Sequence, residues 1–234
     1  MTPFPWKAIA RVALLAAVGC AMPALVRAET FRLLNVDGVA VKWGRPHLGS
    51  GASVTYGFAT AAAHFPDAIN CGALAPMTAL APAWHGERAR LGTVAATAFG
   101  MWSRAADLAF REARPGETPD IVIGAQAEPA GIAFANVWHG PDAGGVAALT
   151  RAAICLNPAV EWTTEDGPVP AGAYDLATVL AHEIGHALGL DHPGPRGALM
   201  AYANQGTMVA LMPGDVAGAV LLYGAAPEQG PGPR

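Results

Sequence analysis

The chain has 234 residues, enough for one ordinary domain with a sizeable core. Its 28 glycines and 20 prolines favour short elements joined by many turns over a long helical bundle. Its 14 basic and 18 acidic side chains give a formal net charge of −4, so the composition offers no basic surface for a polyanion. We therefore expect neither nucleic acid nor an anionic membrane surface as a partner.

The first 28 residues have the features of a secretory signal peptide. Lys7 and Arg11 give a positively charged start, residues 12–26 are mostly apolar, and residues 26–28 end in a small residue suited to cleavage. The apolar run is interrupted by Pro23 and is too short to favour a membrane-spanning helix. We expect export to a secreted, periplasmic or extracellular location.

A second interpretation of the N-terminus depends on Cys20. Residues 17–20 loosely resemble the cleavage box of bacterial lipoproteins, in which the cysteine becomes a lipid-bearing N-terminus. Leucine is usual where Ala17 stands, so the ordinary signal peptide is favoured. Lipidation of Cys20 would tie the protein to a membrane without changing its chemistry.

Cleavage after Ala28 would leave two cysteines, Cys71 and Cys155. In an exported chain, two cysteines most simply form one disulfide. The alternative is a thiol that blocks a metal site, but Cys71 lacks the sequence context of known inhibitory cysteines. The disulfide is the favoured prediction.

The first half of the mature chain predicts a mixture of strands and one long helix. Residues 54–58 alternate in hydrophobicity like a half-buried strand, and residues 59–86 show weak periodicity that suggests irregular or partly helical structure. Residues 87–113 carry apolar residues at helical spacing until a Pro-Gly pair. Three further strands are predicted at residues 120–124, 131–137 and 153–157. Strands on either side of a long helix indicate an α+β fold with helices behind a sheet.

Two more helices are predicted in the second half. One begins near Asp175, a good N-cap residue, and ends at Gly189. The other covers residues 215–223 and closes the domain. We therefore expect one domain over residues 29–224, followed by a flexible Pro- and Gly-rich tail at 225–234.

Residues 182–192 read HEIGHALGLDH and predict a metal site. His182 and His186 are four residues apart, so on a helix they share one face and can reach one zinc ion at roughly 2.0–2.1 Å. Gly189 stands where a helix that ends in the left-handed conformation favours a residue without a Cβ, which lets the chain turn and bring back His192. Three protein ligands leave the fourth tetrahedral position to water, as in a catalytic zinc site.

Glu183 follows His182 and lies about 100° further round the helix. It therefore sits between the histidine face and the apolar face, beside a metal rather than bound to it. A carboxylate so placed can take a proton from a zinc-bound water and return it to a leaving amine. A bare HExxH occurs by chance in many proteins, but three histidines, the glutamate and the glycine together form a specific pattern.

With this motif, the sequence resembles the metzincin zinc peptidases. Residues 197–202, Gly-Ala-Leu-Met-Ala-Tyr, are similar to their methionine turn, and the Tyr-Asp-Leu run at 174–176 indicates the matrixin and serralysin branch (peptidase family M10, bacterial matrixin-like). Trp43 and the Leu-Tyr-Gly run at 222–224 agree with this branch. The resemblance implies a metzincin-type α+β domain, with a twisted mixed sheet, a cleft-edge strand, a long backing helix, the zinc helix and a C-terminal helix.

The resemblance also implies roles for single residues. His182, His186 and His192 would bind one Zn²⁺, Glu183 would be the general base, and Met200 would form the hydrophobic floor beneath the metal.

The strand at 131–137, with Ala133, Phe134 and Ala135, would form the edge of the cleft and pair with an extended polypeptide substrate. Tyr202 occupies the place of a tyrosine that touches zinc in astacins and serralysins. A wall residue of the specificity pocket is an equally good interpretation of Tyr202.

The sequence departs from the family pattern at Asn136 and at Gly214. Matrixins often carry a histidine of a second, structural zinc site where Asn136 falls, so that site is not expected. Gly214 replaces the first of two paired acids, one of which anchors the mature N-terminus, so that activation device is not expected either. The family admits Ca²⁺, but no Asp-rich loop of this chain requires it.

These features together predict a secreted, monomeric zinc endopeptidase. The alternative is an exported, zinc-stabilised binding module that has kept the fold and lost proteolysis. Retention of Glu183 and of a three-ligand open site argues against that alternative.

Overall fold

The structure is a computed structural model that describes residues 31–83, 88–164, 168–194, 196–203, 206–207 and 210–227. The predicted signal peptide, Cys20 and the end of the predicted tail lie outside these residues. Within them, no helix is both long enough and apolar enough to cross a membrane.

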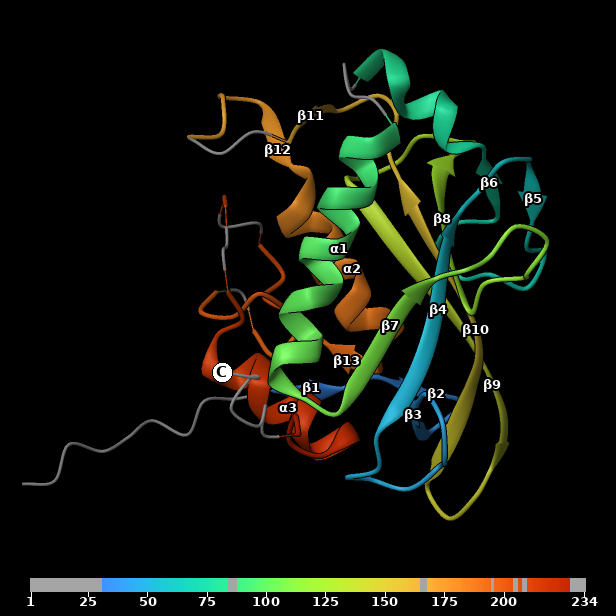
Figure 1. Cartoon of the computed structure of the whole chain (residues 1–234), viewed down its shortest axis with the longest axis vertical. Helices are drawn as coiled ribbons and strands as arrows, with labels where there is room; N and C mark the ends of the chain where they lie inside the picture. Colours follow the sequence, from blue (N-terminus) through green and yellow to red (C-terminus); the bar gives the residue numbers. More distant parts are fainter. Residues whose placement is uncertain are drawn as a thin grey trace, which may run out of the picture.

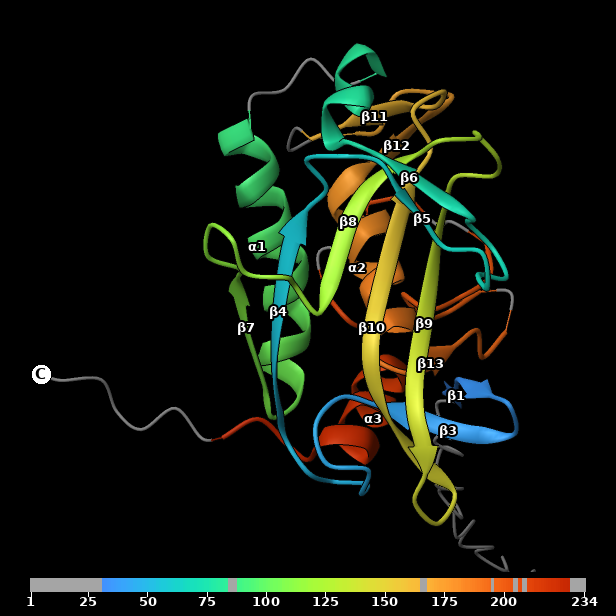
Figure 2. The same ribbon diagram turned by 90° about the vertical axis from the view of Figure 1, so that its right-hand side faces the viewer.

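A mixed sheet is built around its longest strand, β10 (Val146–Leu156). One edge of β10 pairs in parallel with β3 (Val39–Lys42) and β8 (Ile121–Gln126), and the other pairs antiparallel with β9 (Ala133–Asp142). Among the described residues, no strand pairs with the outer edge of β9, which Figure 2 shows as the border of the sheet. The sheet is completed by β2 (Asn35–Val36), β4 (Ala52–Phe58), β5 (Ala63–His64), β6 (Ala73–Ala75) and β7 (Leu108–Glu112).

In the described part of the chain, three α-helices cover one face of this sheet, which confirms the predicted α+β class (Figure 1). They are α1 (Arg88–Ala105), α2 (Leu176–Ala187) and α3 (Pro213–Tyr223), and a 3₁₀ helix η1 (Met77–Ala83) precedes α1. The fully buried indole of Trp102 in α1 donates a hydrogen bond to the Ala181 carbonyl oxygen of α2 at 2.9 Å. Two two-stranded ladders flank α2: β1 (Arg32–Leu33) with β13 (Leu190–Asp191), and β11 (Glu161–Thr163) with β12 (Ala173–Asp175).

Both ends of α2 are fixed by side chains. Asp175 is the N-cap, as predicted, and its carboxylate accepts the Thr178 N–H at 2.7 Å. At the other end the Trp43 indole donates to the Ala187 carbonyl at 2.7 Å. The Tyr223 hydroxyl donates to the carbonyl of Leu188, the next residue, at 2.6 Å. These bonds satisfy carbonyls that the end of a helix leaves without partners.

The predicted long helix at 87–113 is wrong at its C-terminal end. Helix α1 stops at Ala105, and β7 pairs in parallel with β4. The Asp107 N–H donates to the Gly224 carbonyl at 3.0 Å, which takes the chain out of the helix. Leu108 fits helical spacing, but pairing with a distant strand overrides so weak a local signal. Strand β9 starts at Ala133 rather than residue 131 and continues into polar sequence to Asp142, and β10 starts at Val146 rather than residue 153.

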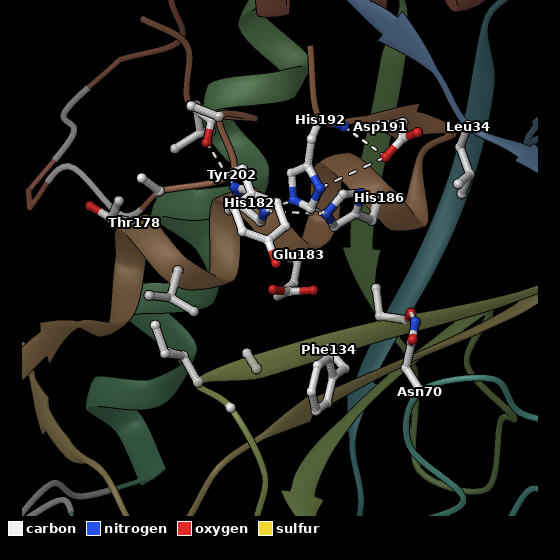
Figure 3. Close-up of a pocket in the computed structure, with 18 of the residues that line it drawn as sticks. Leu34, Asn70, Phe134, Thr178, His182, Glu183, His186, Asp191, His192 and Tyr202 are labelled. Atoms are coloured by element: carbon white, nitrogen blue, oxygen red, sulfur yellow. Dashed lines mark hydrogen bonds and ion pairs between the residues drawn. The ribbon is translucent and has the colours of Figure 1, made fainter. Parts of the chain in front are cut away.

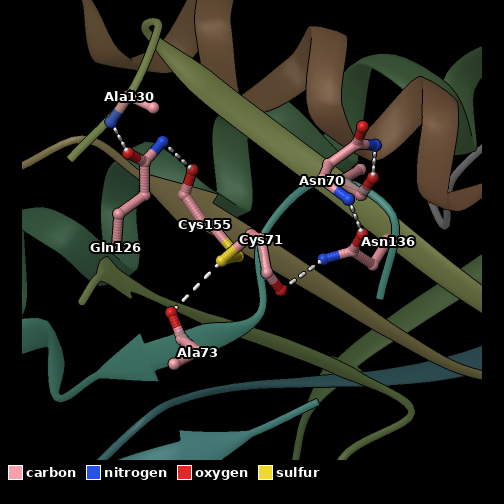
Figure 4. Close-up of a disulfide and its surroundings, with 8 residues drawn as sticks. Asn70, Cys71, Ala73, Gln126, Ala130, Asn136 and Cys155 are labelled. Carbon is pink, nitrogen blue, oxygen red and sulfur yellow. Dashed lines mark hydrogen bonds between the residues drawn. A yellow bond between two sulfur atoms is a disulfide. The ribbon is translucent and has the colours of Figure 1, made fainter. Parts of the chain in front are cut away.

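The predicted disulfide between Cys71 and Cys155 is present, and it joins the β5–β6 hairpin to β10 (Figure 4). A small apolar cluster surrounds it and includes Phe65 and Leu74. Side chains alternate along β9: Phe134 packs on this cluster, whereas its neighbours pack on the main core with the helices. The segment between β5 and β6 therefore packs on part of the face of the sheet that lies opposite the helices.

A pair of glycine substitutions tests the turn after α2. Gly189 has φ +100°, and a Cβ there would overlap the Val41 carbonyl oxygen. Gly172 has φ +88°, with nothing near its Cβ position. We expect Gly172→Ala to cost about 1–2 kcal/mol of unfolding free energy from backbone conformation alone, and Gly189→Ala about 3 kcal/mol or more. Denaturant unfolding of both variants measures the difference, and equal losses would contradict the packing described here.

Candidate metal centre and cleft

Three histidines meet at the end of α2. The helix carries His182 and His186 one turn apart, and the chain after Gly189 passes through β13 and returns with His192 (Figure 3). The three Nε2 atoms lie 3.1, 3.1 and 3.2 Å apart. A tetrahedral zinc ion with bonds of 2.0–2.1 Å separates its nitrogen ligands by about 3.3 Å, so the three rings have the spacing that one such ion requires.

Backbone carbonyls orient two of these rings. His182 Nδ1 lies 2.7 Å from the Leu199 carbonyl oxygen, and His186 Nδ1 lies 2.8 Å from that of Leu190. A carbonyl oxygen only accepts, so each Nδ1 carries the proton and leaves a lone pair on Nε2. These lone pairs point toward one another, an arrangement that is unfavourable unless a cation lies between them.

The surroundings favour the neutral form of the three imidazoles by lowering their pKa values. Burial lowers the pKa of His182 and His192, and it lowers the pKa of His186 to about 3. Neutral imidazole is the form that binds a metal. The donor set, the spacing and the protonation state therefore all fit a divalent cation such as zinc.

The N-terminal strand β1 holds the segment that carries His192. The Arg32 guanidinium pairs with the Asp191 carboxylate at 3.0 Å, and the same carboxylate accepts the His192 N–H at 2.8 Å. The Leu34 N–H donates to the Gly189 carbonyl at 2.8 Å. The sequence analysis did not predict the contacts between β1 and β13, because strands of two residues are too short to show an alternation of apolar and polar residues.

Glu183 is a buried carboxylate in the wall of the same pocket. It is 6 % exposed, and among the described residues it has no hydrogen-bond partner. Burial raises its pKa to about 8. Figure 3 shows the carboxylate directed into the cleft beside the imidazoles. Leaving a buried carboxylate without a partner is costly, and a nearby cation would offset that cost and lower the pKa again.

Met200 lies directly beneath α2. It is buried, and a Cβ on Gly185 would overlap its sulfur, so only glycine at this position allows so close an approach. The buried carboxylate of Asp215 accepts the N–H groups of Leu199 and Met200 at 2.7 and 3.0 Å. Asp215 thus fixes the turn that carries Met200 and the carbonyl that orients His182. An acid in the first turn of α3 was the available sequence signal, but it did not reveal this contact.

A cleft of about 480 Å³ runs between the histidines and β9. The three residues predicted for the cleft edge, Ala133, Phe134 and Ala135, all line it. Leu34 and Asn70, which were not predicted, also line it, and Figure 3 shows them toward the same end. Tyr202 is 78 % exposed, and its ring centroid lies 5.2 Å from that of His192.

Along β9, the main-chain N–H and C=O groups of alternate residues point toward the outer edge of the sheet. The Asn157 N–H donates to the Ile132 carbonyl at 3.0 Å, which fixes the alternation along the antiparallel pair. Phe134 therefore directs its N–H and C=O toward β10, whereas Ala133 and Ala135 direct theirs toward the free edge. The Phe134 side chain packs on the cluster around the disulfide, and the two alanines supply main-chain groups at the edge that lines the cleft.

Comparison with known proteins gives a consistent match. The matrixin (peptidase M10) family model matches residues 83–224, more than half of the chain. The chain is 32 % identical over 146 residues to metalloendoproteinase 1-MMP of Arabidopsis thaliana, which covers 58 % of the chain and 38 % of that protein. It is 37 % identical over 132 residues to mouse matrix metalloproteinase-19, covering 54 % of the chain and 24 % of that protein.

Human stromelysin-3 is 30 % identical over 154 residues, which is 60 % of the chain and 29 % of that protein. The chain therefore spans less than two fifths of the length of these relatives.

Metal titration of the purified protein tests the three-histidine centre. We predict that it binds one zinc ion per chain and that His182→Ala weakens this binding by at least about 100-fold, since removing even an outer partner of a ligand costs 10–100-fold. The control is His64→Ala, because His64 is exposed and lies outside the cleft; this variant should bind zinc like the wild type. Equal zinc affinity in the two variants would contradict the assignment.

Proposed function

This chain belongs to the matrixin family, and on that premise we propose that it is a zinc-dependent endopeptidase. The observation that carries the proposal is the placement of three convergent imidazoles and a buried carboxylate in one cleft beside the edge of β9; among the described residues, that carboxylate has no hydrogen-bond partner and that edge pairs with no strand. The chain matches only part of its relatives' length, so the activity is argued from this site and the family together.

His182, His186 and His192 would hold the zinc ion. Bound zinc supplies Lewis-acid chemistry: it polarises a carbonyl group, lowers the pKa of a coordinated water and stabilises developing negative charge. The fold contributes ring orientation through the Leu199 and Leu190 carbonyls, so little reorganisation is needed when the metal binds.

Glu183 moves the proton. As a carboxylate beside the cation, it accepts a proton from the attacking water and passes it to the nitrogen of the leaving amine. Its freedom from hydrogen bonds within the described residues supports this role, because both carboxylate oxygens remain available to water and substrate.

Strand β9 positions the substrate. An extended polypeptide can pair with the N–H and C=O groups that Ala133 presents at the free edge. Such pairing holds any peptide main chain opposite the histidines, largely regardless of sequence. This suits an enzyme that cleaves within a chain, with side-chain preference set by the rest of the cleft.

We further propose export and a single catalytic domain over residues 29–224. The disulfide between Cys71 and Cys155 supports an oxidising compartment, consistent with the predicted signal peptide. The extended polypeptide substrate and the monomeric state belong to the same proposal.

The variant Glu183→Gln tests the catalytic proposal. The amide keeps the shape of the side chain but cannot accept the proton, so we expect kcat/KM on a peptide library to fall by at least about 10²- to 10⁴-fold with zinc content unchanged. Glu161→Gln, on an exposed residue of β11, is the matched control and should retain full activity.

Full activity in Glu183→Gln would overturn the assignment of the base. Wild type that holds zinc yet cleaves nothing in a broad library would instead favour the zinc-stabilised binding module.

Tyr202→Phe separates the two interpretations of Tyr202. If the hydroxyl stabilises the transition state, kcat falls by about 100-fold, as it does on loss of one oxyanion donor, while KM and zinc content stay the same. We propose this role because the ring lies against His192 at the mouth of the cleft. An altered KM with unchanged kcat would assign Tyr202 to the wall of a specificity pocket.

A further inference from the structure

Part of the outer edge of β9 is covered by a side chain. Besides Ala133, the edge residues are Ala135 and Val137, and all three line the cleft. The carboxamide nitrogen of Asn70 donates a hydrogen bond to the Ala135 carbonyl oxygen at 3.0 Å. That oxygen is an acceptor that a pairing peptide would use. Asn70 therefore already occupies the position that the next stretch of substrate main chain would take.

Asn70 belongs to a loop, residues 65–72, that we call the capping loop. It connects β5 and β6 and lies on the face of the sheet opposite the helices. It precedes residues 83–224, the stretch that matches the family model. From that face the Asn70 side chain reaches round the edge of β9 to the cleft side.

The capping loop is tightly held. The side chain of Asn136, which is 5 % exposed, accepts the Asn70 N–H at 3.1 Å and donates to the Cys71 carbonyl at 3.0 Å (Figure 4). The next residue, Cys71, is bonded covalently to Cys155 of β10. The Phe65 N–H donates to the Gly72 carbonyl at 2.7 Å and closes the base of the loop. Asn70 is thus presented to Ala135 by a disulfide, a buried amide and a backbone bond.

We propose that Asn70 is a specificity-determining residue that ends main-chain pairing between β9 and the substrate at Ala135. This inference rests on the proposed endopeptidase function. A substrate can pair at Ala133 in the cleft that the histidines line, but a longer strand would have to displace the Asn70 amide to reach Ala135 and Val137. Leu34 lines the cleft at the same end as Asn70 (Figure 3).

The consequence is an asymmetric substrate requirement. On the side of the scissile bond that lies over Gly131 and Ala133, each added residue can form main-chain bonds and improve binding. On the side that lies over Ala135, added residues contribute no further pairing. Cleavage efficiency should therefore stop rising after a short length on one side only.

Peptides of graded length test this proposal. A sequence that the wild type cleaves is extended one residue at a time on either side of the scissile bond, and kcat/KM is measured for wild type, Asn70→Ala and Ile69→Ala. Ile69 neighbours Asn70, is 90 % exposed and does not line the cleft, so its variant is the matched control.

We expect wild type and Ile69→Ala to reach a plateau early on one side. In Asn70→Ala, kcat/KM should continue to rise on that side by about 3- to 10-fold, the gain from one or two main-chain hydrogen bonds, with the other side unchanged. The double variant Cys71→Ala, Cys155→Ala releases the capping loop by a different route and should show the same one-sided gain.

A length profile that is identical in wild type and Asn70→Ala, in proteins that fold and cleave, overturns the role of Asn70 and leaves the proposed peptidase function intact. A wild type that cleaves no peptide overturns the proposed function and this inference with it. A purely structural role for Asn70 would lower stability without changing the length profile, and that outcome also counts against the proposal.

Discussion

The structure depends on bringing three imidazole lone pairs to one point at the end of α2. Nitrogen atoms separated by 3.1–3.2 Å with their lone pairs converging repel one another unless a cation compensates, so the fold has to hold the rings there. It does so at the terminus of the helix. Trp43 and Tyr223 bind the last carbonyls, and Gly189 turns the chain closely past Val41. Each of these contacts comes from a segment distant in sequence, so the site requires the whole domain to fold.

The other wall of the cleft is organised by the sheet. Strand β9 borders the sheet, and no strand of the described part of the chain pairs with its outer edge; such an edge is a risk for aggregation. Here the edge faces the histidines at one end and is covered by Asn70 further along. The capping loop and its disulfide thus protect the edge while leaving open the part that lies opposite the candidate metal centre. If the proposed function holds, a single arrangement serves both stability and substrate selection.

The sequence was most informative where chemistry requires fixed spacing. The positions of His182, His186 and Glu183 and the cap at Asp175 follow from helical geometry and are found on α2, and His192 joins the other two histidines after the turn at Gly189. Sequence reasoning failed where a local signal competed with long-range pairing. Leu108 satisfied a helical period and became part of a strand beside β4. The hydrogen bonds that Asn70 makes to Ala135 and Asp215 makes to Leu199 were also not predicted. An amide in a loop or an acid in a helix does not indicate a partner many residues away.

X-ray absorption spectroscopy of the zinc-loaded protein tests the central claim most directly. The account predicts three imidazole nitrogens at roughly 2.0–2.1 Å and one exchangeable oxygen ligand, with the imidazole signal reduced when His192 is replaced. A shell that contains sulfur, or a fourth protein ligand that does not exchange with solvent, would mean that the ion is sealed in a structural site. That result would contradict the hydrolytic account.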